Sequence, residues 1–474
     1  MKARLSPFLT ECKPIVKKLL QALQKDFPYV SILGTDTFGT SFRVQRAGVS
    51  VEDSMWNERG FVVRVHNGIN YSEFSFNDLK EETLSDISAE IKAKIAAQIQ
   101  EFKGLSVGSY PLIQEDASEV SFCGEVRIHP SAVSTKDKLS RMQEMMNGAL
   151  KLSEELVDFR VVYNEVEISK IFVSSKKELE QAYIISEGSL FAIVRRGEKT
   201  KFDYSSYSGL KAVELLDEME AGVEEVVKGA LELLDAEPVI PGEYEVICTP
   251  KITGLIVHEA FGHGVEMDMF VKNRAKAVEY LGKQVASPLI TMRDGAAAAK
   301  DMSSYSFDDE GTLAGDTVII KDGILQTGIS DLLSAMKLGT KPTGNGKRQS
   351  FERKAYTRMT NTFFISGDNT FEEMLSTIKH GYLLDGMMSG MEDPKNWGIQ
   401  CMLVKGREIV DGAFTGKVVS PVILTGYVPD LLNSISMVSK DFELYGAGFC
   451  GKGYKEYVKV SDGGPYIKAK ARLG

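Results

Sequence analysis

The sequence predicts an α+β fold in which a mixed α/β N-terminal half precedes a strand-rich C-terminal half. Helical and alternating segments follow one another in the first half, whereas short strands and glycines dominate the second. Between them, the segment AEPVIPG at 236–242 places two prolines and a glycine between periodic segments. We therefore predict an N-terminal domain at 1–236, with subdomains at about 1–115 and 116–236, and a C-terminal domain at 237–474.

In the N-terminal half, apolar residues at helical spacing predict core-facing helices over 8–23, 84–102 and 139–150, and an acidic helix over 210–234. Alternating residues predict strands over 161–175 and 181–196. The alternating segment 61–76 is interrupted by Asn67-Gly68. This dipeptide predicts a hairpin with a type I′ turn, in which both residues must take positive φ.

In the C-terminal half, an alternating strand over 244–248 is followed by Thr249-Pro250, a strong signal for a helix start. The pattern then predicts a helix over 251–265 and further helices near 371–378 and 430–438. The segments 316–330 and 399–414 predict strand pairs, the first with its turn at Asp322-Gly323.

Composition excludes several classes of protein. The 474 residues, 43% of them hydrophobic, provide ample apolar material for two cores. The net charge of −10 has the wrong sign for a protein that binds nucleic acid or an anionic membrane surface. Five dispersed cysteines without a CxxC pair predict reduced thiols, and no apolar run is long enough for a signal peptide or a membrane span. We therefore expect a cytoplasmic protein.

The predicted helix at 251–265 contains the motif HExxxH, formed by His258, Glu259 and His263. In the common zinc motif HExxH, the two histidines are four residues apart and lie about 40° apart around the helix. Here the offset is five residues, or about 140°, so an ideal α-helix cannot bring both rings to one ion. Metal binding therefore requires a distorted helix. A π-bulge would absorb the extra residue, and Gly262, just before His263, supplies the backbone freedom. Otherwise His263 is not a ligand.

A catalytic zinc site needs a third protein ligand and one open position. Cys450 lies among four glycines in the segment YGAGFCGKG, so its sulfur sits on a closely approachable turn. A thiolate is a good zinc ligand, and a His₂Cys set leaves the fourth position free. Glu259, beside the first ligand, is the candidate general base, and Glu266 is a candidate for supporting His263.

At these residues the sequence resembles the TldD/PmbA family of metallopeptidases, specifically its metal-bearing TldD-type branch. The resemblance rests on three segments in this order: HEAFGHGVE at 258–266, RMTNT at 358–362 and FCGKG at 449–453. It extends in outline over nearly the whole chain. It implies a mixed N-terminal half followed by a strand-rich C-terminal catalytic domain. Two departures are Tyr454, where the family commonly has Gln, and a C-terminal tail without Gly-Gly.

The resemblance implies one Zn²⁺ per chain, bound by His258, His263 and Cys450, with Glu259 as general base. It also implies hydrolysis of extended or unfolded peptides in the cavity of a dimer. The partner is either a second copy of the chain or a paralogue that lacks the metal motif. Arg358 and Asn361, from the second segment, are expected to line the substrate cleft.

Two rival interpretations remain open from the sequence. In a cysteine peptidase, Cys450 would be the nucleophile and one of the two histidines its base, which leaves the other histidine and Glu259 without a role. In a non-catalytic scaffold subunit, a fourth ligand such as Glu266, Asp268 or His380 would close the zinc site.

Two other motifs are misleading. The segment 446–452 matches GxxxxGK, but Gly453 replaces the Ser or Thr of a P-loop and a strand pattern follows it. The acidic run Asp308-Asp309-Glu310 lacks the alternating ligands of a calcium loop and is expected to form a solvated turn. His66, His129 and His380 are expected to be surface or capping residues.

Overall fold

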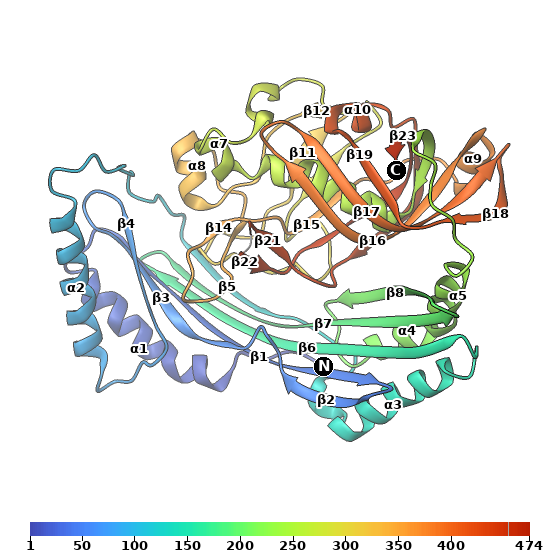
Figure 1. The fold of residues 1–474 in the computed structure, drawn as a ribbon. Coiled ribbons are helices and arrows are strands. Elements are labelled where there is room, and N and C mark those ends of the chain that lie inside the picture. Colours follow the sequence, from blue (N-terminus) through green and yellow to red (C-terminus); the bar gives the residue numbers. More distant parts are fainter. Residues whose placement is uncertain (454) are drawn as a thin grey trace.

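The protein is described here by a computed structural model, which covers residues 1–453 and 455–474. Figure 1 shows two layers: the long strands of the N-terminal half form a sheet at the bottom, and the C-terminal half lies above it around a second sheet. Each half has its own hydrophobic core. The predicted α+β class is confirmed. Tyr454, where the sequence departs from the TldD/PmbA pattern, lies outside the described residues.

The N-terminal half contains one eight-stranded sheet in the order β4-β3-β1-β6-β7-β5, with β2 beside β1 and β8 beside β7. The pairings are antiparallel except that between β5 and β7. The strands are β1 (Val30–Gln45), β2 (Gly48–Asp53), β3 (Glu58–His66), β4 (Tyr71–Phe76), β5 (Ser118–Cys123), β6 (Leu156–Ser174), β7 (Lys177–Arg196) and β8 (Lys199–Gly209). The predicted strands at 161–175 and 181–196 are therefore confirmed as β6 and β7.

Helices cover this sheet at its two ends (Figure 1). They are α1 (Pro7–Leu23), α2 (Leu84–Glu101), η1 (Pro130–Ala132), α3 (Thr135–Ala149), α4 (Leu215–Ala221) and α5 (Val223–Glu232). The first two and α3 confirm the predicted helices, but the single helix over 210–234 is wrong. That segment divides at Gly222, where an added Cβ would lie 1.7 Å from the Tyr207 hydroxyl oxygen. Packing requires glycine there, and glycine weakens a continuous helix.

The hairpin predicted at Asn67-Gly68 is present between β3 and β4, but its turn is different. The ladder ends at the pair His66 and Tyr71, so four residues form the connection rather than two. Gly68 has φ of +94°, whereas Asn67 does not have positive φ. Its side chain instead accepts hydrogen bonds from the amides of residues 69 and 70, which stabilises the wider turn.

The C-terminal sheet has the order β12-β11-β10-β15-β23-β19-β17-β16-β9, with β18 on β17, β20 on β23, and a further pairing of β23 with β9. Its strands are β9 (Gly242–Cys248), β10 (Met292–Asp294), β11 (Thr317–Lys321), β12 (Ile324–Leu325), β15 (Asn361–Phe364), β16 (His380–Asp393), β17 (Gly398–Val410), β18 (Ala413–Val419), β19 (Val422–Tyr427), β20 (Met437–Tyr445) and β23 (Ser461–Leu473). Two small ladders lie outside it: β13 (Gly346–Lys347) with β14 (Tyr356–Thr357), and β21 (Cys450–Lys452) with β22 (Lys455–Val458). The two predicted strand pairs are confirmed, and Asp322-Gly323 has positive φ at both residues.

The helical elements of this half are α6 (Pro250–Leu255), η2 (Ile256–Gly262), η3 (His263–Val265), α7 (Met267–Val271), η4 (Lys276–Tyr280), α8 (Leu332–Leu338), α9 (Phe371–Ser376) and α10 (Val428–Asn433). The helix predicted near 371–378 is α9. The helix predicted over 430–438 is wrong beyond residue 433, because the chain from Met437 onward pairs with β23. No helix among the described residues is long and apolar enough to cross a membrane.

Buried ion pairs connect the two halves. Lys405 on β17 lies 2.5 Å from the carboxylate of Asp203 on β8, and Arg64 on β3 lies 2.6 Å from Glu310. The acidic run at 308–310 is thus part of the contact between the halves, as Lys170 of β6 also pairs with Asp309. The three acidic residues are buried, so the expectation of a solvated turn here is wrong.

Candidate metal centre

The HExxxH motif lies on a helical segment whose geometry changes along its length. It begins as α6 at Pro250, directly after β9, becomes a π-helix in η2, and ends in the short 3₁₀ turn η3. The amide of His263 donates a hydrogen bond to the carbonyl of His258, five residues earlier. This i→i−5 bond is the π-helical pattern, and it stacks positions that an α-helix would place far apart. The predicted distortion is confirmed, and the two ring centroids are 5.0 Å apart.

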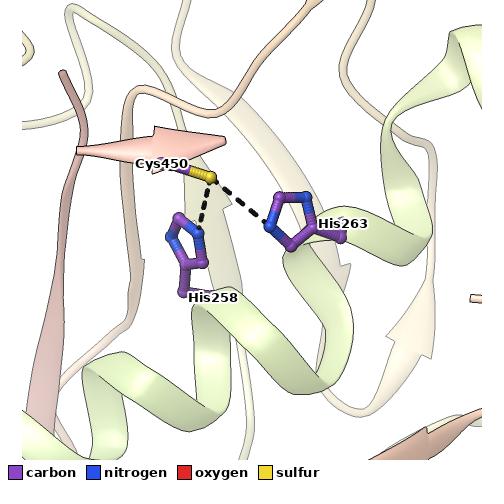
Figure 2. Close-up of side chains that lie close together, drawn as sticks. All are labelled: His258, His263 and Cys450. Carbon is purple, nitrogen blue, oxygen red and sulfur yellow. Dashed lines mark hydrogen bonds between the residues drawn. The ribbon is translucent and has the colours of Figure 1, made fainter. Parts of the chain in front are cut away.

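Cys450 reaches the two rings from the other end of the C-terminal half. It begins the short strand β21, and its Sγ lies 3.1 Å from Nε2 of His258 and 3.4 Å from Nε2 of His263. Figure 2 shows both imidazoles directing a nitrogen toward this sulfur. The three donor atoms lie within 4.8 Å of one another. Two ligand atoms on one tetrahedral zinc ion are separated by about 3.5 Å, so this donor set fits such an ion.

A carboxylate lies behind each imidazole. Nδ1 of His263 is 3.5 Å from Oε2 of Glu266, and Nδ1 of His258 is 3.7 Å from Oδ2 of Asp462 on β23. Metal-bound histidines commonly direct their second ring nitrogen to a carboxylate in this way. Nδ1 of His258 has no hydrogen bond of normal length among the described residues. A small movement of the ring toward Asp462 would complete one when an ion binds at Nε2. Asp462 was not recognised in the sequence, because no local motif marks it.

Burial and charge give this cluster strongly altered proton affinities. Burial alone would raise the pKa of the Cys450 thiol, but the two imidazoles hold that pKa well below its usual value. Burial would lower the pKa of His258, yet the adjacent sulfur raises it to about 9. The same sulfur, with Glu266, raises the pKa of His263. The three side chains therefore favour positive charge between them, which a metal ion would supply in place of ring protons.

Comparison with known proteins shows which family the chain belongs to. Residues 241–471 match the family model described as the PmbA/TldA metallopeptidase C-terminal domain. A protein named metalloprotease from Methanothermobacter thermautotrophicus is 31% identical over 346 residues, which are 72% of this chain and 74% of that protein. The chain belongs to the TldD/PmbA family of metallopeptidases. The family places it among the hydrolases that act on peptide bonds.

Two further proteins are similar to this chain, one in sequence and one in fold. A protein named zinc metalloprotease TldD homolog, from Saccharolobus solfataricus, is 28% identical over 71% of this chain and 75% of its own. The crystal structure of TldE from Thermococcus kodakarensis superposes with a TM-score of 0.75 over 97% of this chain and 99% of that one. Its identity is 17%, so this likeness shows that the fold is shared.

In this TldD/PmbA chain, the candidate ligands His258, His263 and Cys450 line a cleft of about 610 Å³. Glu259 lies in the cleft wall, on the same helical segment as both histidines, and is half-buried. Gly390 on β16 leaves room for it: an added Cβ would lie 2.3 Å from Cγ of Glu259. Apolar side chains also line the cleft, among them Leu255, Met269, Met387, Met391, Tyr445 and Phe449.

Arg358 and Asn361 do not line this cleft, and the expectation that they would is wrong. Asn361 is buried and donates hydrogen bonds to the carbonyl of Gly295 and the hydroxyl of Ser304, away from the metal cluster. Arg358 is also fully buried, but its Nη2 lies 2.9 Å from Sγ of Cys450. It therefore contacts the candidate site from behind the sulfur rather than from the substrate side.

The rival site residues have other partners. Lys452 of the GxxxxGK match lies on β21 and contacts Glu266 at 2.8 Å and Asp268 at 2.7 Å. Its ammonium group is therefore paired with these two carboxylates. His380 is exposed at the start of β16, and its ring lies 3.4 Å from Glu408. Among the described residues, the one group with metal-ligand geometry consists of the two HExxxH histidines and Cys450.

Proposed function

We propose that this chain is a zinc-dependent peptidase that hydrolyses extended or unfolded peptides, with His258, His263 and Cys450 as the metal ligands. The observation that supports this proposal is the convergence of two imidazole nitrogens and one sulfur within 4.8 Å at the wall of a cleft. Three protein ligands leave a fourth position for water or substrate, as in catalytic zinc sites. One Zn²⁺ per chain is expected.

Zinc suits this set because thiolate and imidazole are its preferred ligands. A bound zinc ion would lower the pKa of its water toward about 7 and polarise the carbonyl of the peptide bond. The name of the relative from Saccharolobus solfataricus supports zinc over other metals. Binding requires a deprotonated thiol and unprotonated Nε2 atoms, so protons leave the ligand set when the ion enters.

In this proposal, Glu259 is the general base. Its carboxylate is in the cleft wall next to the first ligand, in position to accept a proton from water and deliver it to the leaving amine. With Glu266 near Nδ1 of His263 and Asp462 near Nδ1 of His258, each ring would carry its proton on Nδ1 and direct its Nε2 lone pair toward the centre. His258 is only 5% exposed, so bulk water has little access to the three ligands from its side.

The cleft also indicates which peptides fit. An extended peptide would add as a strand to an edge of the C-terminal sheet, where backbone hydrogen bonds give affinity without sequence selectivity. Next to the metal cluster, the exposed side chains of Met391 and Phe449 are apolar, and methionine adapts its shape to different partners. We propose peptides with apolar side chains beside the cleaved bond as substrates.

We further propose that the chain works as a dimer, so that a shared cavity restricts access to an otherwise unselective site. Its partner would be a second copy or a paralogue without the metal motif, and the shared fold of TldE supports the second arrangement.

The five cysteines are free thiols, which supports a reducing compartment such as the cytoplasm.

Removal of the metal is the direct test. A strong chelator is expected to abolish peptide hydrolysis, and one equivalent of Zn²⁺ is expected to restore it, as followed with a quenched fluorescent peptide. The cysteine-nucleophile alternative predicts full activity in metal-free protein and its loss on alkylation of Cys450. The scaffold alternative predicts bound zinc without hydrolysis of any peptide in a random library. Either of these results would reject the proposal.

A second test concerns the space beside the proposed base. Gly390→Ala is expected to lower kcat about 100-fold, because the added methyl group overlaps Glu259 and must displace it. Metal content should stay at one per chain, since Gly390 contacts none of the three ligands. Gly398→Ala on neighbouring β17 is the matched control, as an added Cβ there has no atom within 4 Å. An active Gly390→Ala enzyme would show that Glu259 is not needed at this position.

A further inference from the structure

One buried arginine contacts the candidate metal centre without facing the cleft. Arg358 follows the short strand β14, has no exposed surface, and places Nη2 2.9 Å from the sulfur of Cys450. A guanidinium N–H this close to a sulfur makes a hydrogen bond with a charged donor, one of the stronger polar contacts in proteins. The sulfur thus has a cation behind it as well as two imidazoles in front.

The other edges of the same guanidinium are also occupied. Its Nε lies 3.4 Å from Oε1 of Glu266, the carboxylate that supports His263, and its Nη1 donates to the main-chain carbonyl of Glu456. Cys450 and Glu456 belong to the two strands of the β21–β22 ladder, whereas Glu266 follows η3. One planar guanidinium therefore connects the hairpin that carries the sulfur with the helical segment that carries both imidazoles.

We propose that Arg358 is a positioning residue for the metal centre, whose planar fork holds the Cys450 sulfur and the Glu266 carboxylate at fixed places around His263. This inference rests on the proposed zinc site. It assigns Arg358 two effects on a bound ion: it fixes the sulfur in reach of both imidazoles, and it withdraws electron density from the thiolate.

Charge and geometry both favour arginine at this place. The buried carboxylate of Glu266 already has Lys452 at 2.8 Å, so a second cation is not needed to neutralise it alone. The sulfur is the partner that only Arg358 contacts among the described cationic Lys and Arg side chains. A lysine ammonium is a point charge on a flexible stem and cannot contact the sulfur, Glu266 and the Glu456 carbonyl in one plane. Arg358→Lys therefore keeps the charge and removes the geometry.

The experiment measures metal binding directly. Metal-free wild type and Arg358→Lys are titrated with Co²⁺, whose thiolate-to-metal absorption band reports the sulfur, and with Zn²⁺ in competition. We expect Arg358→Lys to bind both ions about 10- to 100-fold more weakly, the range for loss of a residue that supports a ligand. We also expect its cobalt–thiolate band to move to longer wavelength, because the sulfur loses a hydrogen-bond donor.

The matched control is Arg64→Lys. Arg64 is another buried arginine, paired with Glu73 at 2.8 Å and Glu310 at 2.6 Å, and it contacts none of the three ligands. Circular dichroism of each variant establishes that it is folded, and Arg358→Gln, which retains a neutral donor, replaces the lysine variant if that one does not fold. Unchanged affinity in the folded Arg358 variant, an unshifted cobalt band, or an equal loss in Arg64→Lys would each overturn the inference. Failure of wild type to bind either ion would instead reject the zinc site itself.

Discussion

Replacing Glu259 by Gln is expected to lower kcat about 1,000-fold while the chain keeps one zinc ion. The substitution preserves the size of the side chain and removes only its capacity to take a proton from water. Loss of a positioned general base has effects of about 100- to 10,000-fold, and Glu259 would also deliver the proton to the leaving amine. The three ligand atoms lie on other residues, so metal content measured by atomic absorption should equal that of wild type.

The control for this variant is Glu279→Gln, at an exposed position of η4 away from the cleft. It makes the same chemical change and should leave both activity and metal content unaltered. A Glu259→Gln enzyme with more than about one tenth of wild-type kcat would exclude Glu259 as the base. Loss of zinc together with activity would mean that Glu259 is needed to hold the ion rather than to move a proton.

The helix that carries the site could be predicted in unusual detail, because its constraint is local. Two histidines five residues apart on one helix can bind the same ion only if the helix has a π-type distortion. The hydrogen bond from the amide of His263 to the carbonyl of His258 is that distortion. Glu266 was also within reach of the sequence, since it lies three residues beyond His263. Local spacing is sufficient to predict both the helical distortion and the place of Glu266.

Asp462 and Arg358 could not be placed from the sequence, because their roles depend on chain segments that meet only in the folded protein. Asp462 reaches His258 from strand β23, about two hundred residues further along the chain. Arg358 was expected in the cleft, yet it contacts the sulfur from the core side. The sequence around neither residue indicates where its side chain points, so the spacing of the residues does not show what each side chain contacts.

The errors in secondary structure have two origins. Gly222 divides a segment whose apolar pattern predicts one helix, because the ring of Tyr207 from a neighbouring strand occupies the space beside it. Asn67-Gly68 suits a two-residue turn, but hydrogen bonds to the Asn67 side chain stabilise a four-residue turn instead. By contrast, Asp322-Gly323 forms the expected turn with positive φ at both residues. Packing against a distant strand therefore explains the first error, whereas local side-chain hydrogen bonds explain the second.

Replacing Cys450 by Ser is expected to remove the metal, and with it all measurable hydrolysis. Serine is nearly the same size, but a neutral hydroxyl is a poor zinc ligand, and the two histidines alone leave the ion weakly held. We expect zinc affinity to fall more than about 100-fold, beyond the range for residues that only support a ligand. Metal content after dialysis against a mild chelator should therefore fall from one ion per chain to less than about one tenth.

Cys123→Ser provides the matched control, since Cys123 is exposed on β5 in the N-terminal sheet and contacts none of the site residues. Its zinc content and activity should equal those of wild type. The same measurement separates the two catalytic interpretations: if Cys450 is a nucleophile, its serine variant loses activity but keeps any metal that wild type holds. Full zinc occupancy in Cys450→Ser would therefore show that the ion is bound elsewhere, and that the sulfur approaches the two imidazoles to activate a thiolate rather than to share an ion.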